Sequence, residues 1–166
     1  MKSSFHRQLR RIFGYALLML GFAAYSAPEA GASVSSITID AASGEVLSSS
    51  AADTLRYPAS LTKVMTLYIT FDALEKGIIK LDDKLPVSRH AANRSPSKLG
   101  LRAGSSIDVK TCIMAVIVKS ANDCATVLAE GLGYSEENFA KSMTRVSREL
   151  GMKNTTFKNA SGPVSY

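Results

Sequence analysis

An apolar run at residues 61–74 is the feature that most constrains how this chain can fold. Lys63 and Asp72 are its only charged residues, and a proline stands two positions ahead of Ser60. Because proline is favoured in the first turn of a helix, we expect a helix that begins near Ser60 and ends at Gly77. The apolar residues fall nearly all round the helix axis, which predicts a central, buried helix.

Ser60 and Lys63 place a hydroxyl and an amine three residues apart at the start of that helix. Residues i and i+3 share a helix face, so the two side chains are expected to meet. A lysine amine acts as general base for a hydroxyl when burial or another cation lowers its pKa from about 10.4. The N–H groups and dipole of a helix N-terminus also favour a developing oxyanion. With a second polar triplet, Ser120-Ala121-Asn122, between two helical segments, these residues predict an acyl-transfer site.

Other catalytic arrangements find little support in the residues. A Ser-His-Asp site needs a histidine, and His90, which lies in a polar stretch without apolar periodicity, is expected to be an exposed loop residue. Zinc sites draw three or four ligands from clustered His, Cys and carboxylates, and the sequence has no such cluster. It also lacks a glycine-rich loop followed by Lys and Ser or Thr for phosphate binding. We therefore expect neither a metal nor a cofactor.

The N-terminal segment, residues 1–32, is typical of an export signal. Basic residues precede an apolar stretch that is short for a membrane span. An A-x-A site at Ala30–Ala32 predicts a mature chain that starts at Ser33, residues 24–26 offer an earlier site, and an uncleaved anchor is the alternative. Residues 33–166 are enough for one domain with a core. We expect an exported protein, in the periplasm or at the outer face of the cytoplasmic membrane.

The charge of the chain does not indicate a nucleic-acid partner. From Ser33 onward it carries 16 Lys and Arg against 13 Asp and Glu, a difference of +3. One local excess of basic residues lies at 84–102. A solvated loop is expected there, with binding of an anionic cell-envelope substrate as the alternative.

Two cysteines, Cys112 and Cys124, lie within apolar helical patterns. Export permits a disulfide, but this setting favours buried thiols that act as small hydrophobic residues. The sequence leaves open whether they pair.

The remaining pattern predicts an α+β chain with an N-terminal hairpin followed by helices. Alternation at residues 37–47, interrupted by a turn, predicts the β-hairpin. Residues 80–106 are punctuated by Pro, Gly and Asn, which predicts a loop-rich stretch. Further elements are expected as helices at Asp108–Lys119, at Ala125–Glu130 and from an N-cap at Ser135 to Gly151, a short strand at Thr155–Phe157 and a turn at Asn159–Pro163.

Three blocks of residues resemble the D-alanyl-D-alanine carboxypeptidases, the low-molecular-mass penicillin-binding proteins. They are Tyr57–Thr66, which contains an S-x-x-K motif, Ser120–Glu130 and Glu149–Phe157. The blocks occur in the family's order, and the resemblance extends from Ser36 to Pro163. It implies the α+β, transpeptidase-like fold of penicillin-binding proteins and β-lactamases.

The same resemblance implies a role for four residues. Ser60 would be the nucleophile, acylated by the penultimate D-alanine of a peptidoglycan pentapeptide stem with release of the terminal D-alanine. Lys63 would be its base. Ser120 would relay a proton to the leaving amine, and Asn122 would hydrogen-bond the substrate and fix Lys63. β-Lactam antibiotics, which mimic this substrate, would be inhibitors.

The sequence departs from the family in one respect, because no K-T-G or related third motif occurs in it. We expect a C-terminally truncated member, limited to the N-terminal hairpin and the helical region, without the return strands or a C-terminal membrane anchor. Membrane contact is then expected only through the N-terminal segment, and this chain is expected to be inactive. The alternatives are a non-catalytic fragment or binding module and, with less support, a class A β-lactamase, whose E-x-x-L-N motif is missing from residues 150–160.

Overall fold

The computed structural model describes residues 34–162, which belong to two compact units divided after Thr54. The predicted export signal at 1–32 lies outside the described residues. Within residues 34–162 we find no helix whose length and apolar character would let it cross a bilayer. The elements in chain order are β1 (Ser36–Ile39), β2 (Val46–Ser50), the 3-10 turn η1 (Ala59–Leu61), α2 (Thr62–Glu75), β3 (Lys84–Pro86), α3 (Arg89–Ala92), β4 (Ser106–Asp108), α4 (Val109–Lys119), α5 (Asn122–Gly133) and α6 (Glu136–Glu149).

The described part of the first unit contains the predicted hairpin. β1 pairs antiparallel with β2. In the turn, Asp40 Oδ1 accepts hydrogen bonds from the backbone N–H groups of Ser43 at 2.7 Å and Ala42 at 3.1 Å. These bonds lower the pKa of Asp40, and the bond from Ser43 has the larger effect. Gly44 adopts a φ of +75°, a conformation that glycine adopts without strain. The hairpin prediction is confirmed.

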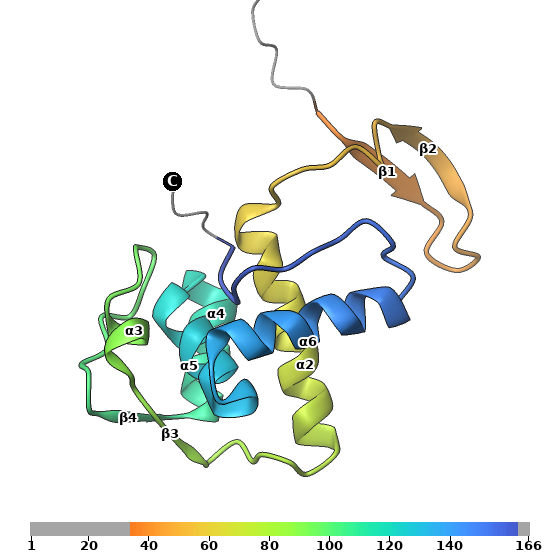
Figure 1. The fold of residues 1–166 in the computed structure, drawn as a ribbon. Helices are drawn as coiled ribbons and strands as arrows, with labels where there is room; N and C mark the ends of the chain where they lie inside the picture. Colours follow the sequence, from red (N-terminus) through yellow and green to blue (C-terminus); the bar gives the residue numbers. More distant parts are fainter. Residues whose placement is uncertain (1–33, 163–166) are drawn as a thin grey trace, which may run out of the picture. The chain divides into compact units, whose positions relative to one another are not determined.

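The second unit is built round α5. This helix contacts α2, α3, α4, α6 and β3, and Figure 1 shows it among the other helices. Residues 122–129 are all buried, and several of them, including Ala125 and Ala129, are small enough for neighbours to pack closely on every side. At Gly131 an added Cβ would lie 2.9 Å from a methyl carbon of Leu85, so glycine allows β3 to approach.

The prediction that α2 is a central helix buried all round is wrong. The buried face of α2 is mostly polar or small, and of its larger apolar side chains only Met65 is buried, while the others are partly buried or exposed. The buried residues are Thr62, Lys63, Met65, Thr66, Thr70 and Ala73. Exposed large apolar residues are Leu61, Val64, Tyr68 and Phe71. Apolar residues all round a helix do not specify which face packs inward. The pattern therefore could not show which face of α2 is buried and which is exposed.

The stretch at 80–106 contains short elements that the sequence did not predict. β3 pairs antiparallel with β4 and places Leu85 opposite Ile107, and both side chains are buried. Ser88 caps α3 by accepting from Ala91 N at 2.9 Å. Elements of three or four residues are too short to show a hydrophobic period. The rest of the stretch is largely irregular, as predicted.

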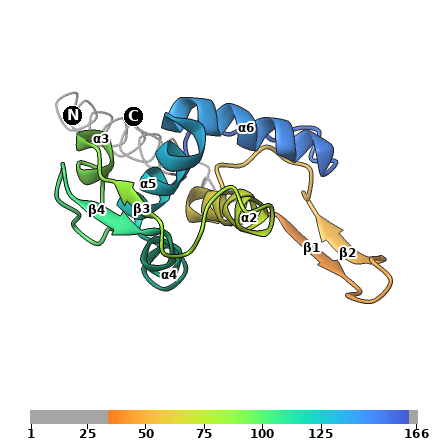
Figure 2. The same ribbon diagram turned by 90° about the horizontal axis from the view of Figure 1, so that it is seen from below.

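The helices α4 and α6 confirm their predictions, including the cap at Ser135. Asp108 Oδ1 accepts from Thr111 N at 2.7 Å, and Ser135 Oγ accepts from Asn138 N at 3.2 Å. These bonds satisfy N–H groups that a helix start leaves unpaired. Viewed from below in Figure 2, α6 lies beside α5. The helix α5 starts earlier than predicted, at Asn122.

The predicted strand at Thr155–Phe157 is wrong. The backbone N–H of Phe157 donates to Thr144 Oγ1 at 2.9 Å. Arg148 donates to the carbonyl oxygens of Met152, at 2.6 Å, and Thr155. Side chains of α6 therefore bind the backbone of this segment. A β-strand would need the backbone of a neighbouring strand as its partner.

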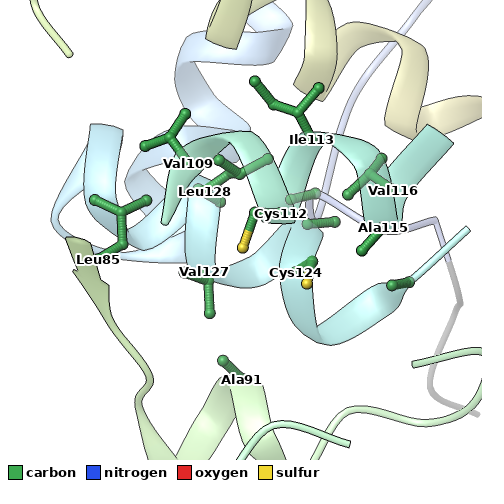
Figure 3. Packing of buried hydrophobic residues seen from close by; sticks show 14 of the residues in the cluster. Leu85, Ala91, Val109, Cys112, Ile113, Ala115, Val116, Cys124, Val127 and Leu128 are labelled. Atoms are coloured by element: carbon green, nitrogen blue, oxygen red, sulfur yellow. The ribbon is translucent and has the colours of Figure 1, made fainter. Parts of the chain in front are cut away.

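Cys112 and Cys124 are buried, as predicted, and both are free thiols. They lie on α4 and α5, within the hydrophobic core drawn in Figure 3. A hydrogen bond with Cys124, together with burial, raises the pKa of the Cys112 thiol. The two residues fill core space as small hydrophobic side chains.

Candidate active site

Ser60 and Lys63 meet at the start of α2, as their spacing predicts. Ser60 lies in η1, which Ala59 opens with a φ of +47°, and Lys63 lies in the first turn of α2. Lys63 Nζ donates to Ser60 Oγ at 3.2 Å. Ser60 is exposed, whereas Lys63 is only 3% exposed. The hydroxyl is therefore accessible from solution, and the amine is sheltered.

A segment far along the chain completes the surroundings of Lys63. The carbonyl oxygen of Ser161 accepts from Lys63 Nζ at 2.8 Å. One turn further along α2, Thr66 Oγ1 donates to the carbonyl oxygen of Ala160 at 2.7 Å. Two side chains on the buried face of α2 thus hold one stretch of backbone against the helix.

The conformation of the turn that carries Ser161 depends on the side chain of Asn159 and on Gly162. Asn159 Oδ1 accepts from Ser161 N at 3.1 Å and from Gly162 N at 2.6 Å. Gly162 has a φ of +93°, and an added Cβ would overlap the carbonyl oxygen of Ala59. Only glycine fits there, because a larger residue would push the turn away from the start of α2. The turn is confirmed over its described residues, while Pro163 lies outside them.

The surroundings of Lys63 disfavour its charged form. Burial is the main cause that lowers the pKa of Lys63, and the positive charge of Arg94 adds to it. The hydrogen-bond acceptors of its amine are a hydroxyl and a carbonyl oxygen, which are neutral. A lowered pKa is the condition under which a lysine serves as general base.

Arg94 and Glu136 also belong to the surroundings of Lys63, and sequence reasoning did not identify either of them. Arg94 belongs to the basic stretch predicted to be a solvated loop, but its side chain is only 18% exposed. Lys84, Arg89 and Arg102 of the same stretch are exposed, as predicted. Nothing in the spacing of these residues marks Arg94 as different, because its partners come from distant segments.

His90 lies in α3 and not in a loop. Its side chain is 54% exposed, so the predicted exposure is confirmed. Its Nε2 lies 2.5 Å from Glu136 Oε2. The partner of His90 is thus Glu136, and among the described residues His90 makes no hydrogen bond with Ser60.

Ser120 and Asn122 lie at the junction of α4 and α5. Ser120 ends α4 with a left-handed φ of +55°. The backbone N–H of Asn122 donates to Ser97 O at 2.7 Å, and its Nδ2 donates to Ser95 O at 2.9 Å and to Pro96 O at 3.3 Å. In the described chain Asn122 therefore holds the loop at 95–97, and its predicted contact with Lys63 stays a prediction.

Asp123 fixes the next part of the same loop, a role the sequence did not reveal. Its buried carboxylate accepts from the backbone N–H groups of Leu99 at 3.0 Å, Gly100 at 2.9 Å and Leu101 at 3.1 Å. A buried carboxylate is stable only when such bonds replace its water. Asn122 and Asp123 together attach residues 95–101 to the start of α5.

No candidate metal centre is found among residues 34–162, where no three His, Cys, Asp or Glu side chains come together in a way that would hold an ion.

Comparison with known proteins agrees with these observations. The family model described as D-alanyl-D-alanine carboxypeptidase, peptidase family S11, matches residues 23–163. This chain belongs to that family. D-alanyl-D-alanine carboxypeptidase DacF of Bacillus subtilis is 39% identical over 128 residues, which are 77% of this chain and 33% of the relative.

Solved structures of related proteins share the fold. The D-alanyl-D-alanine carboxypeptidase DacD of Francisella tularensis matches with a TM-score of 0.76 and 33% identity, over 80% of this chain and 32% of that one. Penicillin-binding protein D2 of Listeria monocytogenes, in its cefotaxime-bound form, matches with a TM-score of 0.68 and 30% identity, over 79% of this chain and 53% of that one. The α+β fold predicted from the sequence is confirmed as part of this fold. The chain spans 33% of the length of DacF.

Proposed function

We propose that this chain carries the nucleophile and the base of a serine-type D-alanyl-D-alanine carboxypeptidase, which removes the terminal D-alanine from peptidoglycan stem peptides. One observation carries the proposal. An accessible serine hydroxyl lies 3.2 Å from a buried lysine amine at a helix start, in a chain of this family.

The reaction follows from the positions of the two groups. In its neutral form the Lys63 amine takes the proton of Ser60 Oγ as that oxygen attacks the carbonyl carbon of the penultimate D-alanine. The tetrahedral intermediate then expels the terminal D-alanine, whose amine takes up a proton, and an ester on Ser60 remains. Water hydrolyses the ester and regenerates the hydroxyl. Because burial and Arg94 lower the pKa of Lys63, more of the amine is neutral near pH 7.

Two further residues are assigned to the substrate side of the site. Ser120 relays the proton to the leaving amine. The amide nitrogen of Asn122 holds the loop at 95–97, and we assign its side-chain oxygen to the peptide N–H of the substrate. Burial of Asn122 at the start of α5 supports this assignment, because a buried amide keeps a fixed orientation.

Location and inhibitors are part of the proposal. We infer that the protein is exported and works in the periplasm or at the outer face of the cytoplasmic membrane, where peptidoglycan is found. We also infer that β-lactams acylate Ser60. The cefotaxime-bound form of the related Listeria protein supports this inference.

A second candidate function is binding of the stem peptide or of β-lactams without turnover. The chain spans 33% of DacF, and no K-T-G-like motif occurs in its sequence. Penicilloylation of Ser60 without release of D-alanine from a diacetyl-lysyl-D-alanyl-D-alanine peptide would favour this candidate over the carboxypeptidase.

Intact-mass analysis of the full-length protein with labelled penicillin tests Ser60. We expect one penicilloyl group, and we expect Ser60→Ala to abolish it because the Ser60 hydroxyl is the one hydrogen-bonded to the Lys63 amine in the described structure. Ser49→Ala, in the exposed strand β2, is the matched control and should be acylated like the wild type. An adduct that persists in Ser60→Ala would rule out this residue as the nucleophile.

Lys63→Arg tests the base. A guanidinium stays protonated, so acylation should slow by at least roughly 10²-fold. Lys76→Arg, at the opposite end of α2 and paired with Asp72 on the surface, is the control and should acylate at the wild-type rate. Near wild-type acylation by Lys63→Arg would place the base elsewhere.

A further inference from the structure

Glu136 is a nearly buried carboxylate that joins three separate parts of the second unit. It lies in the first turn of α6 and is 8% exposed. Its Oε1 accepts from Ala160 N at 3.0 Å and from Thr126 Oγ1 at 3.2 Å. Burying a carboxylate is costly unless it is paired and hydrogen-bonded. The position of Glu136 is therefore fixed by the fold.

Arg94 connects this carboxylate to the turn that holds Lys63. Its Nη1 lies 3.6 Å from Glu136 Oε2, and its Nη2 donates to Ser161 Oγ at 2.9 Å. Its Nε is buried without a hydrogen-bond partner among the described residues, so the guanidinium is held through its two terminal nitrogens. The carbonyl oxygen of the same Ser161 accepts from Lys63 Nζ at 2.8 Å.

From these contacts we propose, on the basis of the function proposed above, that Arg94 is a positioning residue of the Ser60–Lys63 pair. Glu136 holds the guanidinium, the guanidinium holds the side chain of Ser161, and the backbone of Ser161 orients the amine.

Arg94 also places a second positive charge near Lys63. The charged and titratable groups around Arg94 are Glu136, from α6, and His90, from α3, which contacts the Glu136 carboxylate. Neither of them accepts a hydrogen bond from Lys63, whose acceptors in the described structure are Ser60 and Ser161. The charge of Arg94 is one of the two causes that lower the pKa of Lys63, after burial. Arg94 therefore both orients the amine and favours its neutral form.

Direct titration of Lys63 separates this proposal from the catalytic one. The Lys63 side-chain resonance in the full-length protein, assigned by its loss in Lys63→Arg, gives the pKa of the amine by NMR without any substrate. In Arg94→Gln we expect this pKa to rise, and the pH profile of penicillin acylation to move to higher pH with a several-fold loss of rate at pH 7. Arg89→Gln, an exposed arginine in α3, is the matched control and should change neither.

Two variants keep the charge and test the orientation alone. Arg94→Lys retains a cation but cannot contact Glu136 and Ser161 with the same planar fork, and Ser161→Ala removes one end of the contact. We expect both to acylate several-fold more slowly than Arg89→Gln, with the pKa of Lys63 close to that of the wild type.

The proposal is overturned if the Lys63 pKa in Arg94→Gln equals that in Arg89→Gln. It is equally overturned if Arg94→Lys and Ser161→Ala both acylate at the control rate, and this second criterion decides the matter if Arg94→Gln does not fold. A wild-type protein that penicillin does not acylate would contradict the proposed function instead, and the Lys63 titration would still decide whether Arg94 acts on the amine.

Discussion

The helices α2 and α6 have opposite distributions of polar and apolar residues between their buried and exposed faces. In α6 the buried side chains include Phe139 and Met143, and most of its charged residues are exposed. In α2 the buried face carries Lys63, Thr66 and Thr70 beside Met65, and three of its large apolar residues, Val64, Tyr68 and Phe71, are exposed. The difference shows that α6 stabilises the core through its apolar face, whereas the buried face of α2 is shaped for contacts of its polar side chains.

The buried polar groups of α2 are satisfied by specific partners. Thr66 bonds to the backbone of Ala160, Thr70 Oγ1 donates to Thr66 O at 2.8 Å, and Lys63 bonds to Ser161. The two helices also start differently. Ser135 caps α6 with its side chain, while Leu61 offers no side-chain cap to α2. The backbone N–H of Thr62, the first residue of α2, bonds to backbone carbonyl oxygens of η1, so a backbone turn takes the place of a side-chain cap there.

If α6 stabilises the core through its apolar face, truncation of that face should have the largest effect on stability. Met143 is completely buried, so Met143→Ala should lower the free energy of unfolding by about 2–5 kcal/mol. Urea unfolding of the full-length protein measures this, with Met114→Ala, on a half-exposed face of α4, as the control with a smaller loss. Equal losses in the two variants would contradict the core role of α6.

On α2 the corresponding sensitive position is polar. Thr66→Val keeps the shape of the side chain but leaves the buried carbonyl oxygen of Ala160 without its 2.7 Å hydrogen bond. We expect a loss of about 1–3 kcal/mol in the free energy of unfolding. Thr66→Ser, which retains the hydroxyl, should recover part of it. If Thr66→Val were as stable as the wild type, the polar contacts of α2 would not stabilise the fold.

The start of α6 should show a moderate effect. Ser135→Ala removes the acceptor for the N–H of Asn138 and should lower the free energy of unfolding by about 1 kcal/mol. Ser135→Asp, which also accepts this bond, should retain most of the stability. A similar loss in both variants would show that the side-chain cap is not the cause.

The smallest effect is expected on the outer face of α2. Val64 is 63% exposed, so Val64→Thr should change the free energy of unfolding by less than about 0.5 kcal/mol. The same urea titration measures it. A loss comparable to that of Met143→Ala would mean that this apolar face is covered in the full-length protein, and the contrast between α2 and α6 would then have to be revised.

Local features of the sequence predicted much of this fold. The hairpin, the cap at Ser135, and the helices α4 and α6 follow from short-range patterns that the structure confirms. The contact of Ser60 with Lys63 was equally predictable, because a spacing of three residues on a helix brings two side chains together wherever the helix lies.

The tertiary structure alone decided what surrounds that pair. Which face of α2 packs inward could not be derived from apolar residues distributed all round it, and the central position belongs to α5, whose small residues admit neighbours on every side. Lys63 finds Ser161 across 98 positions of sequence. Arg94 differs from the exposed arginines near it only because Glu136 and Ser161 lie within its reach. Helix periodicity is a local property of the chain, but the pKa of a buried amine depends on groups that only folding brings together.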